Sequence, residues 1–352
     1  MRIAIDTMGG DHAPDAIVKG CIEGLAFLDA DDRLILVGDD VVTREILREN
    51  SCDDPRLVLH HAPDVIAMDE APVEAVRTKT NSSLVQTVVL GSAHRVDDPC
   101  DVVISAGNTG ACVSAATMHM RRLPGVHRPG IACAIPTPNG PVVVCDVGAN
   151  PEPRDTHLAQ YAVMAETYAR RVVGITQPRV AQLNIGAEEA KGTGMVKAVR
   201  NMLHDIEELN YVGYVEGREL FDGVVDVVVT DGFVGNTMLK LAEGLAKSLF
   251  KAIALEVFEA DPDLAMRLQP VVGSLMKKND YHEYGGAPLL GVNGVCMICH
   301  GSSEARTIKA AIRMAREYVK AHVNDAIVAR VAEIDERAAR ARNNGTMSQA
   351  TQ

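Results

Sequence analysis

The feature that most constrains the fold of this chain is a series of short apolar runs rich in valine and isoleucine. They recur as RIAID, RLILVG, RLVLHH, DVVIS, IACAI, VVVCD, RVAQLN, VGYVE, VDVVVTD and CMICHG. Several runs are apolar without alternation, which suits strands that are covered on both faces. Helical stretches lie between many of them, at 13–28, 82–94, 109–122 and 156–172. This alternation of strands and helices predicts a mainly parallel sheet with helices on both sides.

Six of the predicted strands are followed by polar loops that contain glycine. RIAID precedes TMGGDH, DVVIS precedes AGNTG, VVVCD precedes VGANP, RVAQLN precedes IGAEEAKG, VDVVVTD precedes GFVGN, and CMICH precedes GSSEA. In parallel sheets, ligands bind at the edge where the strands end. We therefore expect the six loops at one edge, each opening a helix. Their backbone N–H groups would form a site for an anion, above all for phosphate.

Composition narrows the class of protein. The chain has 352 residues, of which 47% are hydrophobic and 23% charged, a profile typical of soluble globular proteins. A net charge of −12 and an aromatic content of 3% argue against a nucleic-acid-binding protein. No apolar stretch approaches membrane-spanning length, and the first residues lead directly into a predicted strand. We therefore expect a cytoplasmic protein.

The eight cysteines do not predict a metal or redox site. Cys296 and Cys299 form a CxxC pair inside GVCMICHG, a buried-strand pattern in which positions i and i+3 face opposite ways. A redox pair needs its first sulfur at a helix N-terminus, and a zinc site needs a second pair of ligands. We interpret the cysteines as small core residues and expect neither a metal nor a cofactor.

The segment 236–279 departs from the alternating pattern. Asn236 to Glu259 predicts a long helix whose apolar residues cover more than one face, and ADPDL then starts a second helix at Pro262. The polar stripe of the first helix consists of Lys240, Glu243, Lys247 and Lys251. Such a helical hairpin either buries its apolar faces at a subunit interface or offers one to a membrane surface. The subunit interface is the simpler interpretation, and the two are compatible.

The last predicted helix carries a basic stripe at spacings of three and four residues. Its members are Arg306, Lys309, Arg313, Arg316 and Lys320. A solvated face is the simpler interpretation, but on so acidic a chain a continuous basic stripe also suits the docking of an acidic partner protein. Residues 342–352 are polar, and we expect this tail to be disordered.

Seven segments of the sequence, in order, resemble the PlsX family, the phosphate acyltransferases of bacterial phospholipid synthesis. They are MGGDHAP, SAGNTGA, DVGAN, LNIGAEEAKG, VEGREL, DGFVGN and EYGGAPLLGVNGVCMICHGSS, spread from residue 1 to about 320. The resemblance implies a three-layer α/β/α sandwich with a mainly parallel, Rossmann-like sheet, similar to the isocitrate and isopropylmalate dehydrogenase fold. It implies a single domain over residues 1–341 that includes the helical hairpin at 236–279. Departures are modest: Thr7 stands where alanine is commoner, and PEPRDTHL follows DVGAN in place of the more usual VDCKPEHL.

The resemblance also implies an activity. The family transfers a fatty acyl group from acyl carrier protein to inorganic phosphate, and the acyl phosphate feeds phospholipid synthesis. Family members form homodimers and contact the membrane peripherally, where a membrane glycerol-3-phosphate acyltransferase uses the product. Two other functions remain open: a phosphate acetyl- or butyryltransferase that uses coenzyme A, and a non-catalytic protein that binds acyl groups or phosphate. An NAD-linked decarboxylating dehydrogenase is disfavoured, because the strand-end loops carry asparagine and glycine instead of metal-binding carboxylates.

Acyl transfer to phosphate makes few demands on side chains. Phosphate is largely a dianion near neutral pH, and a thiolate whose pKa is about 8.5 leaves without a strong general acid. Positioning of the reactants is worth about 7–11 kcal/mol in the best cases, and one oxyanion donor adds about 3–4 kcal/mol. We therefore predict direct attack of phosphate on the thioester, without a metal or a covalent intermediate.

Four residues are predicted to be catalytic. Lys191 would provide a fixed positive charge for phosphate, because a lysine in the first turns of a helix is unfavourable unless an anion is present. Asn108 and Asn236 either hold phosphate oxygens or simply cap helices. His12 either protonates the leaving thiolate or packs in its turn. The predicted phosphate- and substrate-binding residues are Gly9, Gly10, Asp11, Gly107, Thr109, Gly110, Asp146, Gly148, Asn150, Asn184, Asp231, Gly232, Gly235, Gly301 and Ser302. The basic stripe is the predicted docking surface for acyl carrier protein.

Overall fold

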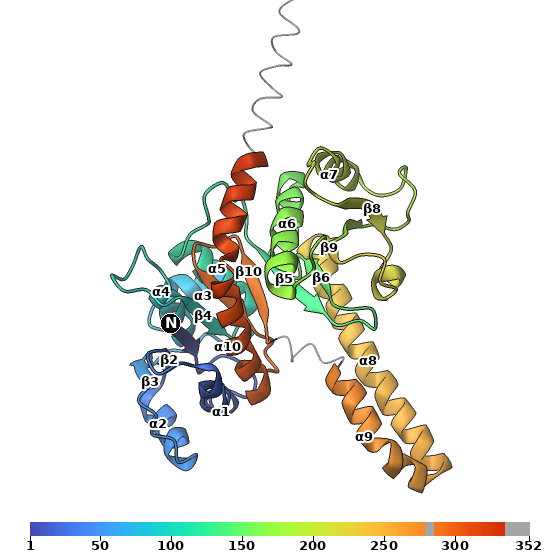
Figure 1. The fold of residues 1–352 in the computed structure, drawn as a ribbon. Coiled ribbons are helices and arrows are strands. Elements are labelled where there is room, and N and C mark those ends of the chain that lie inside the picture. The colour runs from blue at the N-terminus through green and yellow to red at the C-terminus, as the bar shows by residue number, and fades with distance from the viewer. Residues whose placement is uncertain (279–284, 335–352) are drawn as a thin grey trace, which may run out of the picture.

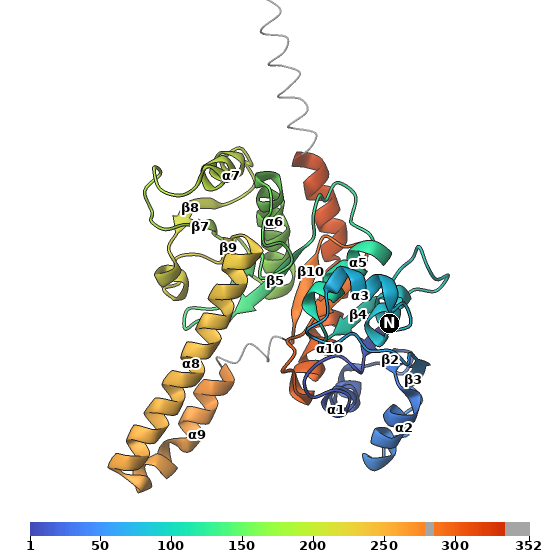
Figure 2. The same ribbon diagram turned by 180° about the vertical axis from the view of Figure 1, so that it is seen from behind.

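A computed structural model describes residues 1–278 and 285–334 of the chain, shown from opposite sides in Figures 1 and 2. Its strands are β1 (Arg2–Asp6), β2 (Arg33–Gly38), β3 (Leu57–His61), β4 (Val102–Ser105), β5 (Gly130–Ile135), β6 (Val142–Cys145), β7 (Val180–Leu183), β8 (Tyr211–Val215), β9 (Val227–Val229), β10 (Ala287–Leu290) and β11 (Val295–Ile298). They form one continuous sheet in the order β3-β2-β1-β4-β11-β10-β5-β6-β9-β7-β8.

Helices connect most of these strands. They are α1 (Asp15–Gly24), α2 (Asp40–Glu49), α3 (Pro72–Thr78), α4 (Ser83–Leu90), α5 (Thr109–His119), α6 (Asp155–Tyr168), α7 (Gly194–His204), α8 (Gly232–Ala260), α9 (Pro262–Lys278) and α10 (Ala305–Lys320). Shorter helical segments occur at Leu25–Phe27, Ala169–Val173 and Gly217–Phe221, and a further helix covers 323–334.

The sheet consists of two parallel halves that run in opposite directions. Strands β1, β2, β3, β4 and β11 are parallel to one another, and so are β6, β7, β8 and β9. Between the halves, β10 is antiparallel to both β11 and β5, and β5 is antiparallel to β6. The mainly parallel α/β sheet predicted from the sequence is confirmed. The reversal between its halves was not predicted, because hydrophobic periodicity identifies a strand without giving its direction.

Helices pack on both faces of the sheet, and each face has its own core (Figure 1). On β1, Ile3 and Ile5 face the core formed with α1, α6, α7 and α10, whereas Ala4 faces the core formed with α3, α4 and α5. All three side chains are fully buried. Burial on both sides explains why the predicted strands are apolar without alternation.

The two cysteines of the CxxC pair are core residues, as the sequence predicts. Cys296 belongs to one core and Cys299 to the other, so their side chains point to opposite faces of the sheet. The Sγ of Cys296 lies 3.7 Å from the Sγ of Cys112, and both cysteines are buried. Burial also raises the pKa of Cys299 to about 12, so the thiol stays protonated near neutral pH.

Helices α8 and α9 lie side by side and project away from the sheet (Figures 1 and 2). The predicted start of the first helix at Asn236 is wrong by one turn, because the Asp231 carboxylate caps an earlier start by accepting a 2.8 Å hydrogen bond from the Val234 N–H. In the ranges that the structure describes, no helix is both long and apolar enough to cross a membrane. The hairpin's predicted end at residue 279 and the predicted tail at 342–352 lie outside the described residues.

Candidate active site

Three of the predicted loops meet at the carboxyl edge of β1, β4 and β11. The backbone N–H of Asp11 donates a 2.7 Å hydrogen bond to the carbonyl oxygen of Gly301, joining the first loop to the third. A Cβ on Gly9 would lie 2.5 Å from Asp6 Oδ2 and 2.7 Å from the backbone nitrogen of Gly107, which shows how closely the first and second loops approach. Only glycine fits at position 9, and these contacts bring the three loops together as one cluster, hereafter the first loop cluster.

The side chain of Asp6 links the first two loops of the cluster by hydrogen bonds. Its buried carboxylate accepts hydrogen bonds from Ser105 Oγ at 2.7 Å and from the backbone N–H of Met8 at 3.2 Å. Burial raises the pKa of Asp6, and hydrogen bonds from the hydroxyl of Ser83 and from neighbouring groups partly oppose that rise. Asp6 therefore fixes the shape of the loops.

The first loop turns at Gly10, where φ is +112°, a left-handed value that favours glycine. A Cβ at this position would also lie 3.0 Å from the carbonyl oxygen of Gly301. Asp11 and His12 follow with exposed side chains, at the rim of the cluster. The next helix, α1, starts at Asp15, and no side chain caps its first turn.

The side chain of Asn108 is fully engaged within the protein. Its Oδ1 accepts a hydrogen bond from the Ala111 N–H at 3.1 Å and so caps α5. Its Nδ2 lies 3.2–3.3 Å from three carbonyl oxygens, those of Ala67, Met68 and Glu70. Of the two roles left open by the sequence, the structure therefore supports helix capping. The amide of Asn108 has no donor left for phosphate.

A cavity of about 90 Å³ adjoins the first loop cluster. Thr109, the first residue of α5, and His300, which follows β11, line it on the side of the loops. The other walls are largely apolar and come from β5, β10, β11, α8 and α10; they include Ile131, Cys133, Leu239, Ile298 and Cys299. The cavity thus places a largely apolar space beside the loops that follow β4 and β11.

His300 is held as a neutral imidazole. Its Nδ1 accepts a 3.2 Å hydrogen bond from the Ser302 backbone N–H and lies 2.8 Å from Ser302 Oγ. An accepting Nδ1 leaves the proton of the neutral ring on Nε2. Burial lowers the pKa of His300, and the charges of Lys240 and Lys247 lower it further. The predicted phosphate-binding amide of Ser302 is therefore already paired with this ring.

The other three loops do not lie at this edge. Strands β6, β7 and β9 run opposite to β1, β4 and β11, so their carboxyl ends are at the opposite edge of the sheet. There the N–H of Gly232 donates to the carbonyl oxygen of Asn150 at 2.9 Å, and a Cβ on Gly148 would lie 3.7 Å from Asn236. The prediction of six loops at one edge is wrong, because it assumed one direction for all strands.

The loops after β6, β7 and β9 are hereafter the second loop cluster. Most of the predicted ligands there are hydrogen-bonded to other groups of the protein. The carboxylate of Asp146 accepts hydrogen bonds from four backbone N–H groups, at 2.7–3.1 Å. Burial raises the pKa of Asp146, and those four bonds partly oppose the rise. Asn150 donates to the Pro129 carbonyl oxygen and the Tyr161 hydroxyl, both at 2.7 Å, and Asn184 donates to the Gly186 carbonyl oxygen at 3.1 Å.

The predicted glycines of both clusters permit close packing. A Cβ on Gly110 would lie 2.7 Å from Pro72, and one on Gly232 would lie 2.7 Å from Asp146 Oδ2. At Gly235 a Cβ would overlap the backbone oxygen of Asp146. These positions therefore keep α5 and α8 close to their neighbours.

Lys191 lies in the loop after β7, with the second loop cluster. Its Nζ forms a 2.6 Å ion pair with Glu188, and its side chain is 45% exposed. The next helix, α7, starts at Gly194 with Thr193 as its N-cap, so Lys191 precedes the helix instead of lying in its first turns. The structure brings Lys191 and Asn236 to the edge opposite Asn108 and Thr109, and a phosphate-binding role for them stays a prediction.

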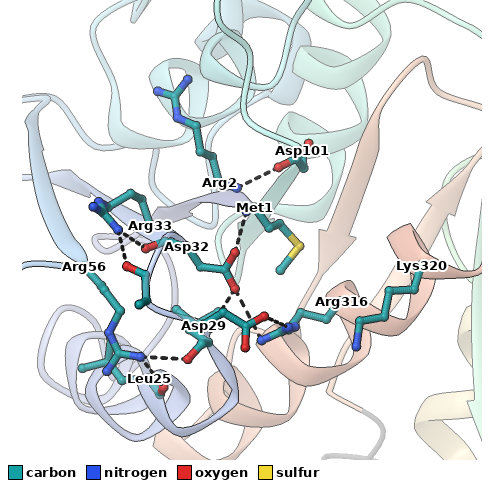
Figure 3. Close-up of polar contacts among 12 residues, drawn as sticks. Met1, Arg2, Leu25, Asp29, Asp32, Arg33, Arg56, Asp101, Arg316 and Lys320 are labelled. Carbon is teal, nitrogen blue, oxygen red and sulfur yellow. Dashed lines mark hydrogen bonds and ion pairs between the residues drawn. The ribbon is translucent and has the colours of Figure 1, made fainter.

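The basic stripe of α10 is largely paired with carboxylates of the same chain. Figure 3 shows Arg316 directed at Asp29 and Asp32, at distances of 2.6 and 3.4 Å. The side chain of Arg316 is only 14% exposed. Burial disfavours the charged form of Asp32, yet the amino group of Met1 and Arg316 outweigh this and lower its pKa. Other pairs along the stripe include Arg306–Glu304, Lys309–Glu23 and Lys320–Glu317, at 3.2–3.5 Å.

These pairs change the interpretation of the stripe. Arg316 joins α10 to the segment after α1, which is a structural role. Docking of a carrier protein on the rest of the stripe stays a prediction.

Glu243 lies in the candidate site but was not predicted as a site residue. From the sequence it was assigned only to the polar stripe of the first hairpin helix. In the structure it lines the cavity, and its Oε1 is buried with no hydrogen-bond partner among the described residues. The available signal was Leu239, one helical turn earlier on the same face, because an apolar residue at that spacing indicates a covered surface.

Comparison with known proteins identifies the family to which the chain belongs. The model of a family described as fatty acid synthesis protein matches residues 1–326. The phosphate acyltransferase of Desulforamulus reducens is 45% identical over 323 residues, which cover 91% of this chain and 94% of the relative. The phosphate acyltransferase of Clostridium perfringens strain SM101 is 42% identical over 330 residues, which cover 93% and 95%.

Solved structures show the same fold at much lower identity. A phosphotransacetylase from Streptococcus pyogenes aligns with a TM-score of 0.60 and 17% identity, covering 91% of this chain and 94% of that chain. The EutD phosphotransacetylase from Staphylococcus aureus aligns with a TM-score of 0.56 and 15% identity, with the same coverage. At such identities the likeness concerns the fold alone.

Proposed function

Since this chain belongs to the fatty acid synthesis protein family, the PlsX phosphate acyltransferases, and is therefore an acyltransferase, we propose that it transfers a fatty acyl group from acyl carrier protein to inorganic phosphate. The product is an acyl phosphate for phospholipid synthesis. We further infer that residues 1–341 form one domain of the Rossmann-like, isocitrate dehydrogenase-like type with an inserted hairpin. The continuous sheet through both halves supports this inference.

The observation that most supports the proposal is the contact between the cavity and the first loop cluster. Thr109 and His300 belong to both, so a ligand in the cavity lies next to the backbone amides. Apolar walls suit the acyl chain, and amides at the start of helices suit the phosphate. The carbonyl carbon of a bound thioester would then lie at the boundary between the two.

In this arrangement the chain contributes mainly position. Gly9 and Gly107 bring the backbone of two loops together, and the Gly10 turn sets the direction of the amides that follow. Phosphate held there attacks the thioester carbonyl directly, the C–O bond forms and the C–S bond breaks. The apolar walls limit water, which would otherwise compete with phosphate for the same carbonyl carbon.

The proposal is tested by incubating the purified protein with a fatty acyl thioester of acyl carrier protein. We expect loss of the thioester only when phosphate is present, with one acyl phosphate formed for each free thiol. Faster turnover of acetyl- or butyryl-coenzyme A would instead identify the coenzyme A-dependent transferase, whose fold the phosphotransacetylases share. Binding of both ligands without any turnover would identify a non-catalytic protein.

We also propose that α8 and α9 form the interface of a homodimer. Both helices expose large apolar side chains. From residue 241 onward on α8, the exposed fraction is 44–68% for Leu241, Leu245, Leu249, Ile253, Leu255 and Phe258. On α9 the exposed apolar residues include Leu264, Met266, Val271 and Leu275. So many exposed large apolar side chains on two adjacent helices are typical of an interface. A second hairpin from another copy would cover it.

Charge reversal within this surface is expected to dissociate the dimer. The double variant Leu245→Glu, Leu249→Glu should sediment as a monomer at concentrations where the wild-type protein is dimeric, because it would bury two unpaired carboxylates. Lys251→Glu is the matched control, since its side chain is exposed on the same helix. If the wild-type protein is a monomer and binds liposomes through the same leucines, the apolar residues form a membrane contact and the dimer proposal is wrong.

A further inference from the structure

Glu243 brings a carboxyl group from α8 into the cavity beside the first loop cluster. It lines that cavity with Thr109, from the start of α5, and His300, from the loop after β11. Its Oε1 is buried and, within the described ranges, has no hydrogen-bond partner. A buried carboxyl oxygen without a partner costs about 1–3 kcal/mol, so a purely structural role gives no reason to keep it.

The surroundings of Glu243 raise the pKa of its carboxyl above that of an exposed glutamate. Burial raises its pKa, and the charges of Lys240 and Lys247 on the same helix oppose that rise. No lysine or arginine within the described residues forms an ion pair with it. The groups that face it from other elements are uncharged near neutral pH: burial raises the pKa of the Cys133 thiol to about 12 and lowers the pKa of His300. A neutral carboxyl can donate a hydrogen bond or a proton, whereas a carboxylate would repel phosphate.

We propose that Glu243 is a catalytic proton relay between the phosphate and the leaving thiol. This inference rests on the proposed function. An unprotonated oxygen of HPO₄²⁻ attacks the thioester carbon, and the C–S bond breaks as the C–O bond forms. The carboxyl proton of Glu243 passes to the departing sulfur, which leaves as a neutral thiol. The Glu243 carboxylate then takes the remaining P–OH proton of the acyl phosphate. One thioester and HPO₄²⁻ thus give one thiol and a dianionic acyl phosphate, and Glu243 ends as it began.

Other groups in the cavity are less suited to this role. The Nδ1 of His300 accepts a hydrogen bond from Ser302. A neutral imidazole would first have to gain a proton before it could donate one and return to its uncharged form. The Cys133 thiol, with its pKa near 12, gives up a proton poorly. Glu243 is the carboxyl among the residues that line the cavity.

The relay is tested by the variant Glu243→Gln with acyl thioesters whose leaving thiols differ in acidity. With an alkyl thioester such as the acyl-pantetheine group, we expect kcat to fall about 100-fold, which is typical for loss of a general acid. With an aryl thioester, whose thiolate leaves without a proton, the fall should be within about threefold. The KM for phosphate should change little. Equal losses with both thioesters, or no loss with either, would overturn the relay.

Glu256→Gln is the matched control, because Glu256 is exposed further along the same helix. It should stay within about twofold of the wild-type kcat for both thioesters. A wild-type protein without any phosphate-dependent turnover would overturn the proposed function and the relay with it, whereas normal wild-type turnover with an unaffected Glu243→Gln would overturn the relay alone.

Stability provides a second readout for Glu243→Gln. Since burial raises the pKa of Glu243 in the folded state, its contribution to stability is present below the unfolded pKa and is lost as pH rises through the folded pKa. The variant should therefore unfold at a higher temperature than the wild type at pH 8, and the difference should shrink toward pH 4. A variant that melts below the wild type at pH 8 would show that Glu243 is structural.

Discussion

Replacing Gly235 by alanine is expected to destabilise the folded protein by about 3 kcal/mol. The new Cβ would overlap the backbone oxygen of Asp146 and lie 3.1 Å from the side chain of Thr230. Neither neighbour can move easily, because four backbone N–H groups fix Asp146 and Thr230 directly follows β9. The start of α8 would have to shift away from the sheet. Urea unfolding monitored by circular dichroism measures the change.

Gly244→Ala provides the control for this prediction. Gly244 lies in the same helix, and a Cβ there would meet no atom within 4 Å. Alanine in an open helix interior should stabilise the protein by about 0.5–1 kcal/mol relative to glycine. Similar effects of the two substitutions would contradict the close approach of α8 to Asp146.

Replacing Gly9 by alanine is expected to lower phosphate-dependent turnover by about 100-fold while the protein stays folded. The added Cβ would lie within 2.9 Å of Asp6 Oδ2 and of two backbone atoms of Gly107, so the first two loops would have to separate. A displacement of about 1 Å at a site that acts by positioning costs on the order of 10²-fold in rate. Initial rates at several phosphate concentrations, together with a melting curve, measure both parts of the prediction.

Gly194→Ala is the corresponding control, because a Cβ at the start of α7 would meet no atom within 4 Å. Its turnover should match that of the wild type. An unchanged kcat/KM for phosphate in Gly9→Ala would exclude the first loop cluster as the phosphate site.

Ten of the eleven strands in the described residues, and most of their helices, could be predicted because each depends on local composition; β10 (Ala287–Leu290) was not among the predicted runs. Ile3, Ala4 and Ile5 show the principle: apolar residues at consecutive positions require cover on both faces, and the structure provides two cores. Cys296 and Cys299 follow the same rule and point to opposite faces. Local patterns therefore carried enough information for the fold class.

The direction of the strands could not be predicted in the same way. The reversal depends on three successive antiparallel pairs, β11–β10, β10–β5 and β5–β6. Short turns join the first and the last of these pairs, whereas β10 and β5 pair across a long stretch of sequence. Loops that look alike in sequence, such as those at Asn108 and Asn150, consequently lie at opposite edges.

The use of each polar side chain was equally hidden. Asp146 and Asn108 are in the loops where a ligand was expected, but their own backbone or a neighbouring segment occupies their hydrogen-bonding atoms. Arg316 belongs to a helical stripe that is visible in the sequence, whereas its partners Asp29 and Asp32 are nearly 300 residues away. Composition shows which groups are present, and only the fold shows which of them are already satisfied.

Helix α8 runs from the second loop cluster to the cavity beside the first loop cluster. At 1.5 Å per residue, Glu243 lies about 12 Å along α8 from the point where Gly235 is wedged against Asp146. A tilt of only about 5° around that wedge would carry the Glu243 carboxyl roughly 1 Å across its cavity, and would swing the far end of the rod by several times as much. A partner that binds the outer end of the hairpin would therefore tilt α8 about Gly235 and so move the Glu243 carboxyl within its cavity.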